Sequence, residues 1–322
     1  MLESLTHQHY SPFEVLVIED GSTRDARSIV ERYKDRLDVH YYVKPNEGQG
    51  FTRNFGFERA RGDYFVIFDS DCLIPPDYLT HVAAFLKKIP LDAYGGPDAA
   101  HESFTDIQQA ISYSMTSPFT TGGIRGNRKH IGTFHPRSFN MGVSRKVWET
   151  VGGFKLTRLG EDIEYSIRIQ ASGFRIGLIP DALVYHKRRT DFRQFYKQLH
   201  FFGRARINIY KHFPNELKLV HFFPAAFVIF LAVLLFLNIR DAVAALHATG
   251  HRPPVTDHWS PITTIGNTLL GSYILLLFFH AWYKSRSLVV ALWSIVASFI
   301  QLVAYGLGFM QDFWKRVVLK KR

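Results

Sequence analysis

Two aspartates near the start of the chain have the spacing of a metal site. Asp69-Ser70-Asp71 directly follows the apolar run at 64–68. In an extended segment, an Asp-x-Asp pair puts two carboxylates on one side, where they can hold a hard cation such as Mg²⁺ or Mn²⁺. Mg²⁺ usually takes one or two protein carboxylates and completes its shell with water and substrate phosphates. The pair therefore predicts a metal site for a diphosphate-bearing substrate.

Two further acidic segments are candidates for chemistry. Glu19-Asp20-Gly21-Ser22 follows the apolar run at 13–18, and Gly160-Glu161-Asp162 opens a stretch that carries isoleucines at helical spacing. A carboxylate of Gly160-Glu161-Asp162 could act as a general base for an acceptor hydroxyl. Acids in a first helical turn also favour the helix dipole. From the residues alone, both interpretations of Gly160-Glu161-Asp162 stay open.

The elements before residue 217 alternate between expected strands and expected helices. Strands are expected at 13–18, 39–43 and 64–68, and helices at 24–34, at 51–60 and after Pro75-Pro76. This alternation predicts an α/β fold with a mostly parallel sheet covered by helices. Ligands of such sheets bind beyond the carboxyl ends of the strands, which is where the acidic segments fall.

Taken together, these motifs resemble family-2 glycosyltransferases of the GT-A fold. The motifs are, in chain order, Val17-Ile18-Glu19-Asp20-Gly21-Ser22-Thr23, Asn46-Glu47-Gly48 with Arg53-Asn54, Asp69-Ser70-Asp71, Asn140-Met141-Gly142 and Gly160-Glu161-Asp162. The resemblance covers residues 2–206 and implies a Rossmann-like GT-A domain. The segment Met1-Leu2-Glu3-Ser4-Leu5 is similar to the end of the family's first helix, so we expect the family's first strand to be absent.

The resemblance also implies roles for individual residues. Asp162 is expected to be the catalytic base, and Asp69 and Asp71 are expected to hold Mg²⁺ or Mn²⁺, with Asp71 as the direct ligand. His186, with Arg188 and Arg189, is expected to approach the diphosphate. The residues expected to bind the donor are Asp20 at the nucleotide base, Arg53 near the diphosphate, and Asp69, Asn140, Gly142 and Glu161.

The implied reaction is an inverting transfer of one sugar from a nucleotide-sugar. The segment 198–202, Gln-Leu-His-Phe-Phe, departs from the Gln-x-x-Arg-Trp signature of processive members, which favours a single transfer. The expected acceptor is a surface polysaccharide or a lipid-linked glycan. Two alternatives stay open: a polyprenyl-phosphate glycosyltransferase, and a non-catalytic membrane protein that binds nucleotide-sugars.

Three long uncharged segments follow residue 217. They lie at 219–237, 262–282 and 288–310, and each is long enough to cross a bilayer core of about 30 Å. Buried core helices are the alternative, but these usually carry a polar stripe. We therefore expect about three transmembrane helices in a domain at 217–322, attached to a GT-A domain at 1–186.

The basic residues around these segments indicate an orientation. Lys284 and Arg286 lie in the short loop between the second and third segments, which places this loop and the catalytic domain in the cytosol, at the cytoplasmic membrane. Three spans would then put the basic tail at 315–322 outside, against the same rule. Either one segment is interfacial or re-entrant, or the rule fails at the tail.

A basic segment at 187–216 joins the two domains. Eight lysines and arginines up to Lys211 face one acid, Asp191, and aromatic residues are interleaved at helical spacing. This pattern predicts an amphipathic helix at a membrane surface, with a helix packed on its own catalytic domain as the alternative. The net charge of +11 and the sequence pI near 9.6 then need no nucleic acid. The single cysteine, Cys72, excludes an internal disulfide framework.

Overall fold

The chain folds into two compact units in a computed structural model that describes residues 1–121, 134–247 and 260–320. The first unit comprises Met1–Phe104 and Thr116–Arg188, and the second comprises Thr105–Met115 and Arg189–Arg322. The boundary at residue 188 lies close to the boundary expected at 186. The segment Thr105–Met115 differs from expectation, because it joins the C-terminal unit although the sequence places it inside the GT-A domain.

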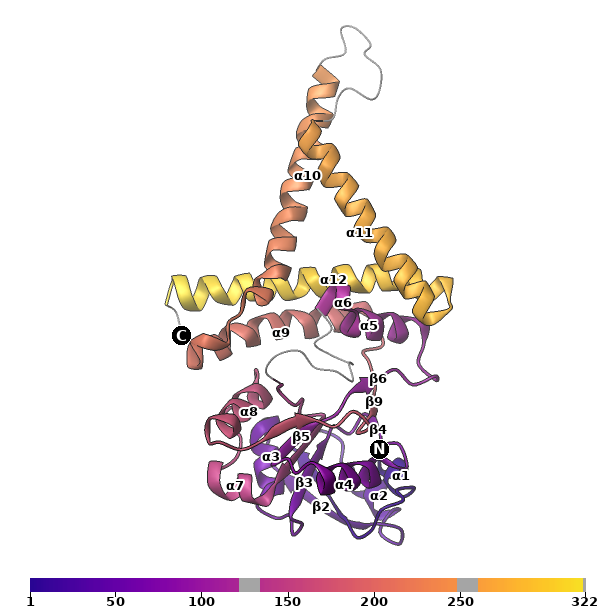
Figure 1. Cartoon of the computed structure of the whole chain (residues 1–322), viewed down its shortest axis with the longest axis vertical. Helices are drawn as coiled ribbons and strands as arrows, with labels where there is room; N and C mark the ends of the chain where they lie inside the picture. Colours follow the sequence, from indigo (N-terminus) through magenta and orange to yellow (C-terminus); the bar gives the residue numbers. More distant parts are fainter. Residues whose placement is uncertain (122–133, 248–259, 321–322) are drawn as a thin grey trace. The chain divides into compact units, whose positions relative to one another are not determined.

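The first unit contains alternating helices and strands (Figure 1). They are α1 (Leu2–Leu5), β1 (Glu14–Asp20), α2 (Arg27–Glu31), β2 (Asp38–Lys44), α3 (Gln49–Phe57), β3 (Tyr64–Phe68), β4 (Cys72–Leu73), α4 (Tyr78–Lys88), β5 (Ala93–Gly95), β6 (Asp98–Ala99), α6 (Pro118–Thr121), β7 (Asn140–Ser144), α7 (Arg145–Val151), α8 (Glu161–Ala171), β8 (Ile176–Leu178) and β9 (Val184–His186). The strands expected at 13–18, 39–43 and 64–68 are confirmed as β1, β2 and β3.

The described strands form three sheets. β1 pairs with β2 in parallel, the second sheet has the order β3-β7-β5-β8, and the third has the order β4-β9-β6. The α/β architecture is confirmed, but the parallel character is weaker than expected. β7 runs antiparallel to both β3 and β5, because the chain returns to the sheet in the opposite direction after residue 134. Among the described strands, β1 pairs only with β2 and β3 only with β7.

β3 is covered on both faces, which explains its uninterrupted apolar sequence. Phe65 and Ile67 pack into a cluster with Phe57 of α3 and Tyr165 of α8. The side chains on the other face of β3 pack into a second cluster, which contains the fully buried Tyr78 of α4. Because both faces are fixed by packing, the acidic residues that follow the strand start from a rigid position.

The second unit is helical. Its elements are α5 (Asp106–Thr116), α9 (Phe192–His212), the 3-10 turns η1 (Pro214–Glu216) and η2 (Leu219–Phe222), α10 (Phe223–His247), α11 (Pro261–Ser285), α12 (Leu288–Phe313) and η3 (Trp314–Val318). Three helical stretches, Leu219–Leu246, Pro261–Ser285 and Leu288–Val318, are long and apolar enough to cross a membrane. Of the basic tail, residues 321 and 322 lie outside the described residues.

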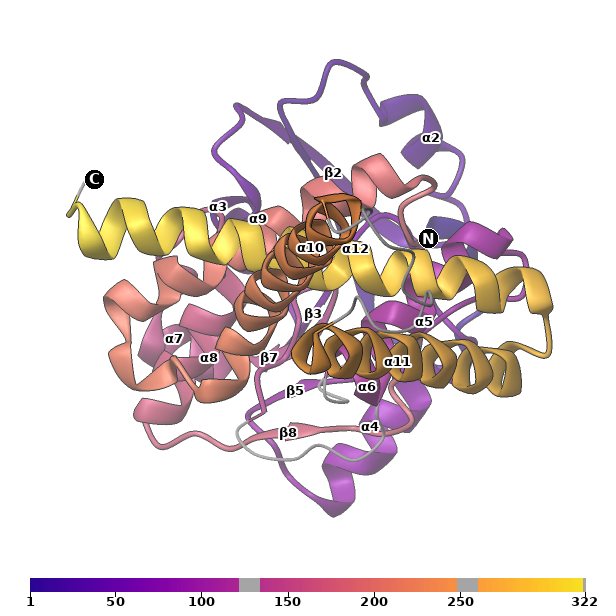
Figure 2. The same ribbon diagram turned by 90° about the horizontal axis from the view of Figure 1, so that it is seen from above.

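Within this unit, α12 runs beside α9, while α10 and α11 form a hairpin that rises from α12 (Figures 1 and 2). Ala110, Ile111 and Met115 of α5 pack into the same cluster as Phe195 of α9 and Val290 of α12. The segment that leaves the first unit is therefore an integral part of the second.

Candidate active site

Asp20, at the end of β1, is held by groups of the neighbouring strand and loop. The parallel register of β1 and β2 sets Asp20 opposite Lys44, whose Nζ donates to Asp20 Oδ1 at 2.9 Å. The backbone N–H groups of Glu47 and Gly48 donate to the two carboxylate oxygens, each at 3.0 Å. Asp20 therefore fixes the loop that precedes α3 and places a negative charge at the N-terminus of that helix.

These contacts change the acidity of Asp20. Burial alone would raise the pKa of this carboxyl, but hydrogen bonds from Lys44 and from the backbone of Glu47 and Gly48 lower it to about 2. Asp20 is therefore ionised over the whole physiological range. Its expected contact with a nucleotide base stays a prediction, and the structure adds that Asp20 organises the surrounding loop.

A glycine brings α3 close to the loop before α8. A Cβ at Gly50 would lie 2.1 Å from the carbonyl oxygen of Leu156, and Gly50 N donates to Thr157 O at 3.0 Å. No side chain fits in this contact without moving the backbone. The close approach lets two α3 side chains, Gln49 and Arg53, reach the first turn of α8.

Arg53 connects two of the acidic motifs. Its Nη1 donates to Glu161 Oε1 at 2.9 Å, and its Nη2 donates to Asp69 Oδ1 at 3.3 Å. Gln49 also donates to Glu161. Glu161 is buried, and burial raises its pKa, with the charge of Asp162 adding to the effect and Arg53 opposing it. The structure thus brings together Arg53, Asp69 and Glu161, which lie far apart in the sequence.

Asp162 follows Glu161 in the first turn of α8 and is more accessible. Its side chain is 15% exposed, against 4% for Glu161. Asp162 Oδ1 accepts a hydrogen bond from Ile163 N at 2.9 Å, and Oδ2 lies 3.7 Å from Arg137 Nη1. Glu161 is tied to the protein by its hydrogen bonds, whereas the Arg137 guanidinium stands 3.7 Å from Asp162 Oδ2, beyond hydrogen-bond distance.

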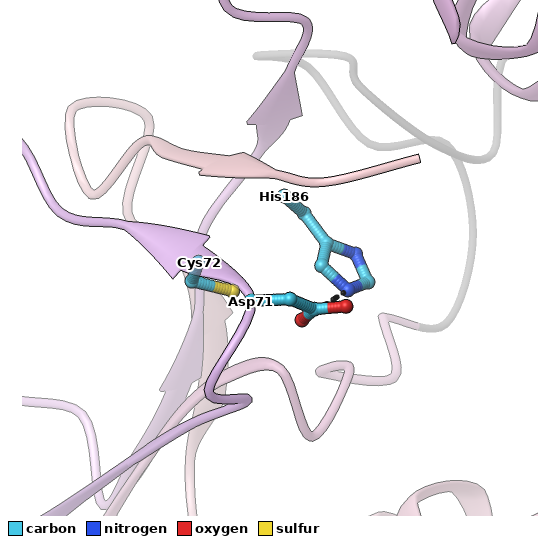
Figure 3. A group of neighbouring side chains, drawn as sticks. All are labelled: Asp71, Cys72 and His186. Atoms are coloured by element: carbon cyan, nitrogen blue, oxygen red, sulfur yellow. Dashed lines mark ion pairs between the residues drawn. The ribbon is translucent and has the colours of Figure 1, made fainter. Parts of the chain in front are cut away.

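Asp71 lies beside His186, whose strand β9 pairs with β4 (Figure 3). The register sets Cys72 opposite His186, so that Asp71 Oδ1 lies 3.2 Å from His186 Nε2. Asp71, Cys72 and His186 offer ligand atoms that all lie within 4.8 Å of one another. The His186 ring stacks on Phe139 with the ring centroids 4.5 Å apart, which fixes its orientation.

The chemistry of these groups fits a divalent cation held by Asp71 and His186. A carboxylate oxygen and an imidazole nitrogen suit Mn²⁺, and Mg²⁺ prefers oxygen. Asp71 is 38% exposed at its side chain. Cys72 is fully buried, and burial raises the pKa of its thiol, so that it stays protonated and is a poor ligand. Asp69 points to Arg53 instead of joining this group.

Asn140 and Gly142 of β7 are part of the core. Asn140 Oδ1 accepts from Tyr78 Oη at 2.6 Å, and its Nδ2 donates to Ala182 O at 2.7 Å. A Cβ at Gly142 would lie 1.9 Å from the Tyr94 ring. Contacts of these two residues with a donor stay predictions, and the structure gives both of them protein partners.

The basic residues near the end of the first unit have different partners, so they do not form one group. His186 joins the candidate metal group, whereas Arg188 forms a buried ion pair with Asp98. Three further residues of this site, Lys44, Gln49 and Arg137, are not predicted by the sequence motifs. Lys44 is the last residue of a strand beside the strand that ends in Asp20, so a register argument could have found it.

Comparisons with known proteins agree with this fold. Residues 1–152 match the sequence profile described as Glycosyl transferase family 2. A protein named as an uncharacterized glycosyltransferase from Rickettsia felis is 30% identical over 125 residues, which are 38% of this chain and 20% of that protein. The chain therefore spans about a fifth of the length of this relative. Glycosyltransferase AglE of Haloferax volcanii is 24% identical over 225 residues, which are 65% of this chain and 68% of AglE.

A solved structure shares the fold. The mannosyltransferase PcManGT from Pyrobaculum calidifontis, solved in complex with GDP-Man and Mn²⁺, superposes with a TM-score of 0.53. The alignment covers 94% of this chain and 81% of that chain, at 17% identity. The shared fold and the match over residues 1–152 lead to one conclusion: the N-terminal part of this chain has a GT-A fold and is similar to glycosyl transferase family 2 domains.

Proposed function

We propose that this protein is a metal-dependent, inverting glycosyltransferase that moves one sugar from a nucleotide-sugar to an acceptor hydroxyl. The observation that carries the proposal is the Arg53 bridge, which ties Asp69 of the Asp-x-Asp motif to Glu161 beside Asp162. A donor-binding edge and a candidate base are thereby held in one rigid arrangement. Such positioning is a large part of the catalysis of group transfer.

Each group has a distinct task in this proposal. Asp162 removes the proton from the acceptor hydroxyl, which then attacks the anomeric carbon in a single displacement that inverts its configuration. Asp71 and His186 would hold a Mg²⁺ or Mn²⁺ ion, which when bound supplies positive charge to the departing diphosphate. Arg53 and Glu161 hold the two motifs in register.

The named relatives support a nucleotide-sugar as the donor class. PcManGT is described with GDP-Man and Mn²⁺, and AglE is named a glycosyltransferase. Carboxylates at the sheet edge beside a His–Asp pair are groups that can bind a metal and a diphosphate together. The departure of segment 198–202 from the processive signature supports transfer of a single sugar.

Membrane attachment is part of the same proposal. The three apolar helical stretches of the second unit support an anchor in the cytoplasmic membrane. The basic turn at Lys284 and Arg286 favours the cytosolic side for this turn and for the catalytic unit. An anchored enzyme suits an acceptor that is itself held at the membrane, such as a surface polysaccharide or a lipid-linked glycan.

The test is transfer from a panel of nucleotide-sugars with Mn²⁺, using membranes that contain the protein. Asp162→Asn should lower transfer by about 10²- to 10⁴-fold, the usual contribution of a general base, while binding of the nucleoside diphosphate is kept. Asp63→Asn, an exposed acid of the same unit, is the matched control and should transfer at the parent rate. Near-parent transfer by Asp162→Asn would show that another group is the base.

The product distinguishes the acceptor class. A polyprenyl-phosphate acceptor has no proton to remove at neutral pH, so a sugar linked to polyprenyl phosphate, formed equally by Asp162→Asn, would contradict the proposal. Binding of the nucleoside diphosphate without turnover of any donor would indicate a non-catalytic binding protein.

A further inference from the structure

α9 and α12 form one tightly packed pair that runs in the same direction. Phe192 near the start of α9 contacts Trp293 near the start of α12, with ring centroids 5.5 Å apart. Towards the other end, Arg204 Nε lies 3.1 Å from Asp312 Oδ1, and Arg316, just beyond α12, donates to Asn208. The two helices therefore accompany each other over almost their whole length.

Glycines make this contact close. A Cβ at Gly203 of α9 would lie 2.1 Å from Tyr305 O, and a Cβ at Gly308 of α12 would lie 2.1 Å from His200 O. Asp312 is buried and pairs with both Arg204 and Arg316. A pair joined by backbone approach and buried charges has to occupy a membrane as one body.

α9 is too charged to cross a bilayer. It carries five lysines and arginines, namely Arg193, Lys197, Arg204, Arg206 and Lys211. Transfer of a single cationic side chain to the bilayer centre is already unfavourable, and α9 would need five. Because α12 is bound along α9, an α12 that crossed the membrane would carry these charges into the hydrocarbon.

The α10–α11 hairpin has a different relation to α12. Phe227 in the second turn of α10 contacts Phe299 of α12, with ring centroids 5.6 Å apart. Further along, Asn238 of α10 and Asn267 of α11 donate hydrogen bonds to each other. The hairpin thus rises from α12, which runs across its foot, as Figure 1 shows.

The exposed face of α12 is apolar although its partner helix is basic. Its large exposed side chains include Leu288, Val289, Leu292, Trp293 and Val296, and Trp314 follows at the other end. Tryptophan is enriched at the interface between hydrocarbon and water. An apolar face backed by a basic helix is the arrangement of an element that lies in the interface plane.

We propose that only α10 and α11 cross the membrane, and that α12 lies in the plane of the bilayer surface, with its exposed apolar face in the acyl chains and α9 on its polar side. This inference rests on the proposed membrane attachment and refines it from three spans to two. It also removes the conflict between the basic α11–α12 turn and the basic tail under the positive-inside rule. With two spans, Lys284, Arg286 and the basic tail lie on one side of the membrane with α9.

The sidedness test uses cysteine labelling in the full chain. The native Cys72 is fully buried, so the parent chain gives the background. Ala244→Cys beyond Arg240, Lys284→Cys in the α11–α12 turn and Lys320→Cys after α12 are treated with a membrane-impermeant maleimide in spheroplasts and in inverted vesicles. We expect Lys284→Cys and Lys320→Cys to label in inverted vesicles and Ala244→Cys to label in spheroplasts.

A depth measurement distinguishes an in-plane helix from a spanning one. Leu292, Val303 and Trp314 lie 11 residues apart and so share one helix face. Each is replaced by a spin-labelled cysteine, and the accessibility to oxygen and to a water-soluble nickel complex is measured in vesicles of phosphatidylethanolamine and phosphatidylglycerol. An in-plane α12 gives three similar depths, whereas a spanning α12 gives a deep Val303 between two shallow ends.

Two results would overturn the inference: labelling of Lys320→Cys from the same side as Ala244→Cys, or a deep Val303. Labelling of all three cysteines from both sides would overturn the membrane attachment as well. Neither measurement uses sugar transfer, so a failure here is separate from a failure of the proposed activity.

Discussion

Arg53 Nη1 lies 2.9 Å from Glu161 Oε1, although 108 residues separate the two in sequence. The side chains are 11% and 4% exposed. The same guanidinium reaches Asp69 at 3.3 Å, so that one arginine sets the distance between the two acidic motifs of the site.

Replacement of Arg53 should cost both stability and transfer. Arg53→Met leaves the Glu161 carboxylate buried without its cation, and loss of one partner of a buried pair costs about 3 kcal/mol. Thermal unfolding in detergent measures the loss. The double variant Arg53→Met/Glu161→Gln should regain most of the stability but not the transfer rate, because Asp69 is still released.

The matched control is Arg36→Met, which breaks an exposed Arg–Glu pair with Glu3 at 2.9 Å. Exposed pairs contribute about 0–1 kcal/mol, so this variant should unfold close to the parent temperature. Equal effects of Arg53→Met and Arg36→Met would contradict the bridging role.

Asp20 should make the stability depend on pH in the acid range. Its pKa of about 2 in the folded chain lies below the unfolded value of 3.8. A lowered carboxyl pKa contributes stability that is present above pH 3.8 and is lost as the pH falls towards 2. The contribution is about 2 kcal/mol at neutral pH.

Asp20→Asn removes this contribution. The stability difference between parent and variant, measured by thermal unfolding, should therefore be largest above pH 5 and shrink steadily between pH 4 and pH 2. A difference that stays constant over this range would mean that the Asp20 charge is not the source of the stability.

His186 should affect metal binding more than folding. Removal of a metal-site group or of its immediate support usually weakens metal affinity about 10- to 100-fold. His186→Ala should raise the Mn²⁺ concentration needed for half-maximal transfer by such a factor. The same shift should appear in Mn²⁺ binding followed by electron paramagnetic resonance, which does not depend on turnover.

The chain offers a second His–Asp pair for comparison. His9 Nδ1 lies 2.8 Å from Asp77 Oδ1, and both side chains are more than half exposed. His9→Ala should leave the Mn²⁺ dependence unchanged. A parallel shift in both variants would show that loss of an imidazole acts through general stability.

Gly203 should be intolerant of any side chain. A methyl group at this position meets Tyr305 O at 2.1 Å and forces α9 and α12 apart, and overpacking of this kind costs about 1–3 kcal/mol. Gly203→Ala should lower the unfolding temperature in detergent. Gly271→Ala in α11 has no atom within 4 Å of the new carbon and should be neutral or slightly stabilising.

The sequence predicts the first half of the fold well because its signals are local. The apolar run at 64–68 becomes β3 at the predicted residues, since both of its faces are buried. β7 lies antiparallel between β3 and β5, and its pairing with β3 joins residues some 75 positions apart. No local sequence pattern indicates such a pairing. For the same reason, the sequence places α5 in the GT-A domain, although its apolar residues pack against helices α9 and α12, which follow much later in the chain.

The site shows the same division. Four acidic residues can be recognised from the sequence because they end or follow a strand or begin a helix: Asp20, Asp69, Asp71 and Asp162. The bridge from Arg53 to Glu161 depends on the close approach at Gly50, and the pairing of Asp71 with His186 depends on the register of two short strands. Both are properties of tertiary structure and leave no spacing signal.

The course of the chain through α5 limits how this protein can be divided. The polypeptide leaves the first unit at Phe104, contributes Thr105–Met115 to the second, and returns before it leaves again at Arg188. A shortened chain that ends at residue 188 would keep α5 and lose Phe195, Leu199 and Val290, against which α5 packs. Its apolar face would then attract other copies. A soluble, crystallisable version of the first unit therefore needs α5 redesigned or bypassed by a linker as well as removal of the C-terminal helices.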